Sequence, residues 1–181
     1  IRDRPYKNQS GTNLEPAPDI SIRYGTGDYP GFVTIKLFTP HCIPVCRPEI
    51  LNADRPLNSI KDLLKYTLIH DETTRAADHP LDWRAWFASN GSKDIEIQQG
   101  PQFSNSLLAI EAAINGQGIA LALKPLVASD LASGRLVAPF DIELPSPYAY
   151  HLLVTKASID KPSVVSFCEW MGRVCESNMG Y

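Results

Sequence analysis

The residues best suited to nucleophilic or metal chemistry are the cysteines, and their spacing favours neither. Cys42 and Cys46 flank a proline in the strand-like run HCIPVC, which does not form the knuckle of a zinc site. No base or orienting partner is identifiable for Cys42, as a nucleophilic thiol requires. Cys42/Cys46 and Cys168/Cys175 each lie within one rigid element, too far apart for a good disulfide. We expect reduced thiols, no metal, no cofactor and no catalytic residue.

Polar residues at the ends of predicted elements are better candidates for binding a small molecule. Ser104, Asn105 and Ser106 stand directly before an apolar helical pattern, so they can cap its first turn. A helix start also presents unpaired N–H groups and a partial positive charge, which suit the carboxylate of a ligand. Capping alone and capping combined with ligand binding are both compatible with these three residues.

Other candidates end or line predicted strands, and each has a structural alternative. Arg23–Gly25 closes a strand, where ligands of open α/β sheets bind, but a strand-end arginine can equally be a surface residue. Asp71 also ends a strand and can be a ligand contact, a solvated acid or a helix N-cap. Tyr148 and Tyr150 lie two residues apart, so they share one face and belong either to a binding site or to the core.

Composition bounds the function. The 181 residues are 44% hydrophobic and 20% charged, which is enough apolar material for a core. The net charge of −3 comes without a Lys/Arg cluster, which argues against a free-standing nucleic-acid binder. No apolar run approaches the roughly 20 residues that span a bilayer, and no signal peptide opens the chain. We therefore expect a cytoplasmic protein without membrane contact.

The expected secondary structure alternates between strands and helices, which predicts an α/β fold. Gly116 and Gly118 form the corner between a helix and a fully buried strand. Trp83, Trp86 and Phe87 have helical spacing and are expected in the core or an interface. The expected strands cover residues 19–25, 32–48 with a break at Pro40, 67–70, 95–103, 119–123, 136–140 and 149–156. The expected helices follow Ser59 and cover 80–91, 107–115, 125–134 and 162–178.

Several strings occur together in an order and spacing that resemble one family. They are DISIRYGTGDYPG, IKLFTPHCIPVCRPEIL, LLKYTLIHDE, DWRAWFASNG and QQGPQFSNSLLAIEAAINGQGIALALKPLVASDLASGRLVAPF. Together they resemble the effector-binding domain of LysR-type transcriptional regulators, in the subgroup of the glycine-cleavage and β-lactamase activators. The resemblance runs from about Asp19 to Met171, and none of the strings is a catalytic signature.

The resemblance implies a two-lobed, type 2 periplasmic-binding-protein-like α/β fold with two crossover hinge strands. Lobe I would comprise residues 1–39 and 142–181, with its N-terminal part incomplete, and lobe II residues 40–141. Hinge residues would be Thr39, Pro40, Pro139 and Phe140. The effector, expected to be an anionic metabolite, would lie in the inter-lobe cleft against Arg23, Tyr24, Gly25, Asp71, Phe103, Ser104, Asn105, Ser106, Tyr148 and Tyr150.

The resemblance also implies partners. The family forms side-by-side dimers, here through the helix of residues 107–115 or its neighbours, and the C-terminal helix of residues 163–175, with Trp170 and Met171, is the other candidate. The full-length regulator would be a homotetramer. DNA would bind only through an N-terminal winged helix-turn-helix, which does not precede Asp19 in recognisable form, so this chain alone should not bind DNA specifically. The alternative is a free-standing solute-binding protein or small enzyme with the same two-lobed fold.

Overall fold

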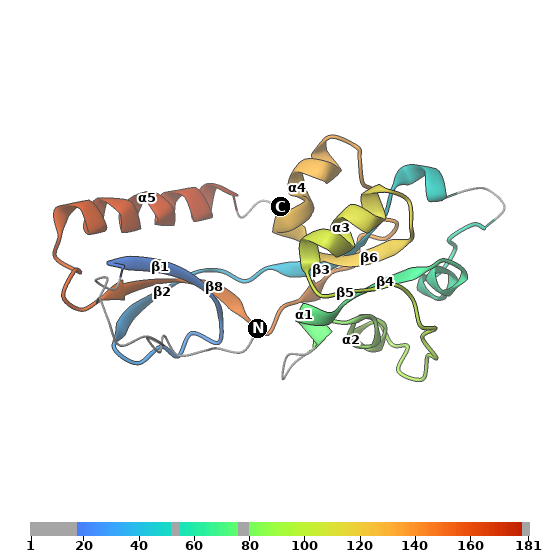
Figure 1. The fold of residues 1–181 in the computed structure, drawn as a ribbon, viewed down its shortest axis with the longest axis horizontal. Helices are drawn as coiled ribbons and strands as arrows, with labels where there is room; N and C mark the ends of the chain where they lie inside the picture. The colour runs from blue at the N-terminus through green and yellow to red at the C-terminus, as the bar shows by residue number, and fades with distance from the viewer. Residues whose placement is uncertain (1–17, 52–54, 76–79, 179–181) are drawn as a thin grey trace, which may run out of the picture. The chain divides into compact units, whose positions relative to one another are not determined.

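The computed structural model describes residues 18–51, 55–75 and 80–178, which fall into two compact units. The first unit runs from His41 to Ser146. The second combines the chain up to Pro40 with the chain from Pro147 onward. Each unit has its own sheet (Figure 1). Residues 1–17 of the predicted lobe I lie outside the described residues.

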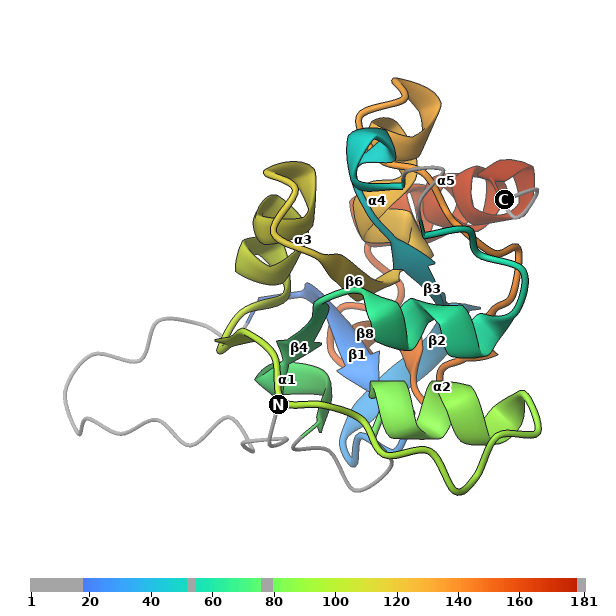
Figure 2. The ribbon, with the colours of Figure 1, turned by 90° about the vertical axis from the view of Figure 1, so that its right-hand side faces the viewer.

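The first unit is a five-stranded sheet with helices on both faces (Figures 1 and 2). Its order is β5 (Gln102–Phe103), β4 (Leu68–Asp71), β6 (Ile119–Leu123), β3 (His41–Val45) and β7 (Leu144–Pro145). The first three strands are parallel, and β3 is antiparallel to β6 and β7. Helices α3 (Ser106–Ile114) and α4 (Lys124–Ala132) lie on one face and α2 (Trp83–Ser89) on the other. The short helices are α1 (Glu72–Arg75), η1 (Pro48–Ile50) and η2 (Ile60–Lys65).

The face below α3 is built from small side chains. Strand β6 is buried along its whole length, as its continuous apolar run predicts. Its Ala120 and Ala122 belong to the same buried cluster as Ala109, Ala112 and Ala113 of α3. Short side chains on both elements let the helix approach the sheet closely. The larger members of the cluster fill the space around them: Ile43, Val45, Ile69, Ile110, Val127 and Leu136.

The opposite face is built from aromatic side chains. Trp83, Trp86 and Phe87 are buried, which confirms their predicted place in the core. Each indole N–H has a backbone partner: Trp83 Nε1 donates to the Ile69 carbonyl at 2.9 Å and Trp86 Nε1 to the Ile142 carbonyl at 3.2 Å. These bonds satisfy the polar edge of two large buried rings, which would otherwise carry a desolvation cost.

The second unit is an antiparallel sheet in the order β1 (Ile20–Gly25), β8 (Ala149–Thr155) and β2 (Phe32–Phe38), with helix α5 (Pro162–Asn178) contacting β2. Side chains alternate along each strand, so the register sorts residues into two faces. Ile22, Leu152 and Ile35 form a row on one face. Arg23, His151 and Lys36 form a row on the other.

Three predicted elements differ from the structure. The strand expected at 95–103 is reduced to Gln102–Phe103, because Pro101 has no N–H with which to extend the ladder. The strand expected at 136–140 is a single bridge between Val137 and Cys46, and Pro139 lacks a donor in the same way. The helix after Ser59 is a 3₁₀ helix, η2.

The corner between α3 and β6 has the predicted glycines in the predicted roles. Gly116 has φ 75°, the left-handed conformation that ends a helix. Gly118 lies against strand β4, and a Cβ there would collide with the Thr67 carbonyl oxygen. That carbonyl accepts the Ile119 N–H at 2.8 Å, so a side chain at Gly118 would disturb the β4–β6 pairing.

Among the described helices, none is long and apolar enough to cross a membrane.

We predict that Gly118→Ala destabilises the protein by about 1–3 kcal/mol, because the added methyl overlaps a backbone atom that cannot move away freely. The measurement is urea unfolding of both proteins. The matched control is Gly172→Ala in α5, where a Cβ meets no atom within 4 Å, and which should be neutral or slightly stabilising. Equal effects of the two changes would contradict the close approach.

Candidate functional site

A hydrogen-bonded cluster lies in the first unit at the C-terminal ends of the parallel strands. It consists of Asp71, Thr73 and Ser106. The parallel strands β4 and β5 end at this position of the sheet, and α3 begins there. Ser106 Oγ donates to Asp71 Oδ2 at 2.5 Å, and Thr73 donates to Asp71 Oδ1 through Oγ1 at 2.6 Å and through its N–H at 2.8 Å. All three residues are half-buried, so the carboxylate is held firmly while remaining accessible at the surface.

The hydrogen-bond directions in this cluster determine what it can bind. Ser106 and Thr73 have one hydroxyl proton each, and the two short bonds to Asp71 use both of them. No hydroxyl proton therefore remains for the 3.2 Å contact between the two hydroxyl oxygens. A ligand meeting this cluster finds a carboxylate and two hydroxyl lone pairs, which accept hydrogen bonds. The cluster suits an ammonium or amide N–H group better than an anion.

Asn105 caps helix α3. Its Oδ1 accepts the Leu107 N–H at 2.8 Å, and its carbonyl accepts the N–H groups of Leu108 and Ala109 at 3.1 and 3.2 Å. The exposed Ser104 precedes the cap. Because these donors of the first turn are already bonded, the helix start offers less to a carboxylate than its sequence predicts. Phe103 lies half-buried at the end of β5, beside Asp71 in the strand register.

In the second unit, an aromatic group occupies one end of the sheet. The Tyr24 ring lies 5.7 Å from Tyr148 and 5.0 Å from Tyr150, and Phe38 stacks on Tyr150 at 5.0 Å. Gly25 is buried and pairs with Ala149. The three predicted tyrosines are therefore brought together at the end of the sheet where β1 stops and β8 begins.

Arg23 does not belong to this aromatic group. Successive residues of a strand point to opposite faces, so Arg23 shares its face with His151 and Lys36, whereas Tyr24 lies on the other face. Arg23 is exposed, and no ion pair engages it in the part of the chain that the structure describes. The predicted residues of the second unit thus separate into an aromatic group and an exposed cation.

Comparison with known proteins decides the family. A profile of the LysR substrate binding domain matches residues 14–176. The chain belongs to this family. The glycine cleavage system transcriptional activator of Escherichia coli K12 is 37% identical over 153 residues, covering 84% of this chain and 48% of the relative. The HTH-type transcriptional activator AmpR of Citrobacter koseri is 33% identical over 153 residues, covering 84% and 50%.

The fold agrees with solved structures of the family. The effector domain of the transcriptional regulator AmpR of Pseudomonas aeruginosa superposes with a TM-score of 0.71 at 28% identity, covering 88% of this chain and 72% of that chain. The predicted fold class and the predicted subgroup are both confirmed. The chain spans about half the length of the curated relatives it matches.

In this LysR substrate-binding domain, one of the two predicted hinges lies at a boundary between the units and the other does not. Thr39 and Pro40 directly precede the first unit, which begins at His41. Pro139 and Phe140 lie inside the first unit, and the second connection follows Ser146. Their role as hinges stays a prediction.

Sequence analysis missed a group of polar contacts close to both segments that connect the units. Its members are His41, Lys124 and Glu143. Glu143 accepts a hydrogen bond from Lys124 Nζ at 2.6 Å, and its other carboxylate oxygen lies 2.9 Å from His41 Nδ1. The contact joins the first residue of β3 to the segment before β7 and to the start of α4. No local pattern signals it, because the three residues are far apart in sequence. Thr73 was also missed, although an Asp-x-Thr pattern after a strand is typical of a capping turn.

The two buried thiols, Cys42 and Cys46, are poor nucleophiles. Burial raises the pKa of Cys42 to about 12, with the nearby Asp71 charge adding to the effect, and burial alone raises the pKa of Cys46 to about 12. The thiolate form that nucleophilic attack requires is therefore suppressed. Within the described ranges, no three His, Cys, Asp or Glu side chains gather in a way that could hold a metal ion.

Proposed function

We propose that this chain is the effector-sensing domain of a LysR-type transcription regulator and that a small molecule contacts both of its units. The family match and the transcriptional activators among its relatives support this assignment. The Asp71–Thr73–Ser106 cluster carries it within the chain, because it is a rigid, accessible polar group at the C-terminal ends of parallel strands, where α/β proteins bind ligands. The free-standing solute-binding alternative is not favoured, since the relatives are regulators.

The charges at the candidate site favour an effector of mixed polarity. Arg23 is a cation suited to a carboxylate, as the expectation of an anionic effector requires. The Asp71 cluster, in contrast, accepts hydrogen bonds and suits an ammonium or amide donor. A molecule with both features is an amino acid or a short peptide. We therefore propose that the effector belongs to this class. It carries the expected anionic group and also a hydrogen-bond donor that binds Asp71.

We predict that thermal shift measurements with the standard amino acids will identify at least one stabilising compound, and that its N-acetyl and amide derivatives will bind less tightly. The N-acetyl form loses the ammonium that Asp71 would receive, and the amide form loses the carboxylate that Arg23 would receive. Asp71→Asn should weaken binding about tenfold to a hundredfold, since a charged hydrogen bond contributes about 1.5–3 kcal/mol.

The matched control is Asp94→Asn, an identical change at an exposed position of the first unit. Equal affinity of the two variants would contradict the role of Asp71. Binding of the N-acetyl form as tight as that of the parent would contradict the proposed ammonium contact. If no amino acid or dipeptide changes the melting temperature, the proposed effector class is wrong.

The chain spans about half the length of its curated relatives, and we propose that DNA binding in the whole regulator belongs to another part of the protein. Self-association, as a homodimer here and a homotetramer in the full-length regulator, is also a proposal. Helix α3 offers Leu107 and Leu108, which are 58% and 53% exposed. Ile110 of the same helix is only 5% exposed, so an acidic residue there would test folding and not association.

We predict that the chain forms a weak dimer at micromolar concentration and that Leu108→Asp raises its dissociation constant at least tenfold, because a charge would be buried in the contact. Sedimentation velocity over a concentration series provides the measurement, with the exposed Gln117→Asp as the control. A monomer at every concentration would contradict the dimer. A dimer unaffected by Leu108→Asp would contradict the use of α3.

A further inference from the structure

Three basic side chains form a row on one face of the second unit's sheet. In the strand register, Arg23 of β1 lies opposite His151 of β8, and Lys36 of β2 lies opposite the same histidine from the other side. Cross-strand partners point to the same face of a sheet, so these three side chains do as well. Because neighbouring strands are about 4.8 Å apart, the two outer residues are about 10 Å from each other at the backbone. We call this group the basic row.

The outer members of the basic row are unpaired cations. Arg23 and Lys36 are exposed, and neither makes an ion pair within the part of the chain that the structure describes. Other cationic side chains are paired with a carboxylate: Arg47, Lys65, Lys124, Arg135 and Lys161. The adjoining rows of the same sheet face carry no acidic side chain, since they are Ser21–Leu153–Thr34 and Gly25–Ala149. The charge of the basic row is therefore open to a ligand.

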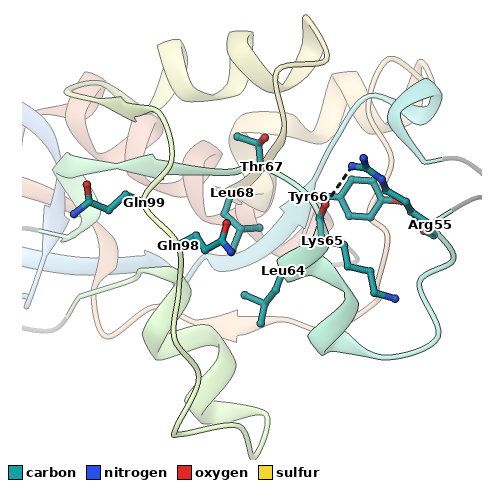
Figure 3. A pocket seen from close by; sticks show the side chains of 8 residues that line it. All are labelled: Arg55, Leu64, Lys65, Tyr66, Thr67, Leu68, Gln98 and Gln99. Carbon is teal, nitrogen blue, oxygen red and sulfur yellow. Dashed lines mark hydrogen bonds between the residues drawn. The ribbon is translucent and has the colours of Figure 1, made fainter.

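A cavity of about 190 Å³ beside the start of β4 does not offer comparable charges (Figure 3). Its lining includes Arg55 and Lys65. Arg55 Nη1 donates to the Lys65 carbonyl at 3.3 Å, and Tyr66 Oη donates to the Arg55 carbonyl at 2.7 Å. Lys65 Nζ pairs with Asp62 at 2.6 Å. Both cations of this cavity are thus engaged, which leaves the basic row as the better place for an anion.

His151 is the fixed centre of the basic row. It is only 6% exposed, and the Tyr29 ring meets its imidazole edge-on at 6.1 Å. A Cβ on Gly27 would lie 2.8 Å from Nε2, so the loop of residues 26–31 packs directly against the ring. The one carboxylate of this loop, Asp28, is exposed and makes no ion pair with the described residues.

The second nitrogen of the imidazole is buried without a partner. His151 Nδ1 has no hydrogen-bond partner among the residues that the structure describes. A buried polar atom left in this state costs about 1–3 kcal/mol, which a bound hydrogen-bonding group would recover. The strand register places a long, unpaired cation on each side of this histidine. An anion held between the two cations would bring an oxygen to the middle of the row, where Nδ1 lacks a partner.

We propose that the basic row binds two carboxylates of one molecule, so that the effector is an acidic amino acid or a short peptide with an acidic side chain. Arg23 supplies a planar fork of N–H donors that matches one carboxylate, and Lys36 supplies a point charge for the second. Two cations that start about 10 Å apart suit two separate carboxylates better than one compact anion. The link to the effector rests on the function proposed above, because Arg23 serves in both, whereas anion binding by the row does not depend on it.

The test of the row is titration of the chain with glutarate, a dicarboxylate without an amino group, observed by ¹H–¹⁵N NMR at an ionic strength held constant with chloride. Because glutarate offers no donor to Asp71, the result is independent of the proposed Asp71 contact. We expect saturable shifts of the Arg23, Lys36 and His151 amides and of the His151 imidazole nitrogens. Glutarate should bind at least fivefold more tightly than acetate.

Two variants with matched controls locate the site. Arg23→Gln and Lys36→Gln should each weaken glutarate binding at least fivefold. Arg173→Gln and Lys156→Gln, the same changes at exposed positions of the same unit, should leave it unchanged. All four side chains are exposed, so the variants should fold. Shifts that do not saturate, unchanged affinity in Arg23→Gln or Lys36→Gln, or binding of acetate or inorganic phosphate as tight as that of glutarate would overturn the proposal.

The acidic class of the effector is tested separately by thermal shift with L-glutamate and L-glutamine, which differ by one negative charge at nearly equal size. We expect glutamate to raise the melting temperature more than glutamine does. An equal or larger effect of glutamine would overturn the acidic class and leave the proposed amino-acid effector intact. If glutarate binds in the row but no amino acid or dipeptide raises the melting temperature, the row stands and the effector class proposed above is wrong.

Discussion

The close approach of two glycines to strand β4 is the constraint on which the first unit depends. Gly100 lies against the Leu68 carbonyl and Gly118 against the Thr67 carbonyl, where any side chain would collide. With both neighbours drawn in at its start, β4 is fixed between β5 and β6. Its last residue, Asp71, is thereby carried to the start of α3, where Ser106 can reach its carboxylate although the two lie 35 positions apart.

The Asp71 cluster changes the chemistry expected of the site. A helix start preceded by serines predicts a place for an anion, but Asn105 satisfies the first turn and the Ser106 proton is directed to Asp71. The first unit therefore supplies acceptors. The cation lies in the second unit, at Arg23, on the sheet face away from the tyrosines. We propose an effector with charges of both signs because the two candidate groups differ in charge.

Local patterns predicted most of the fold. The alternation in residues 19–25, the continuous apolar run of β6, and the glycines at 116 and 118 are strong signals. Burial and backbone conformation restrict the residue types at those positions themselves, whatever the partner is. The expected strands at 95–103 and 136–140 were mostly wrong, because the number of partner residues and the missing N–H of proline decided their length. A periodic pattern shows that a segment can be a strand but not whether a neighbour is available to pair with it.

The candidate site was less accessible to sequence reasoning. The positions were found at element ends, but the bond from Ser106 to Asp71 joins residues 35 positions apart and depends on the folded sheet. The bonds from Thr73 to Asp71 are local, and the Asp-x-Thr pattern could have indicated them. The sequence could have predicted that Arg23 and Tyr24 lie on opposite faces of the sheet, because successive residues of a strand alternate between the two faces. The contacts among His41, Lys124 and Glu143 could not be predicted from the sequence, because only the folded sheet brings these residues together.

Hydrogen–deuterium exchange directly tests our proposal that one effector contacts both units. The chain is compared with and without the amino acid or dipeptide that gives the largest thermal shift. We expect protection in two places at once: residues 71–75 and 103–108 of the first unit, and residues 20–25 and 148–150 of the second. Protection confined to one unit, or located away from these segments, would contradict it.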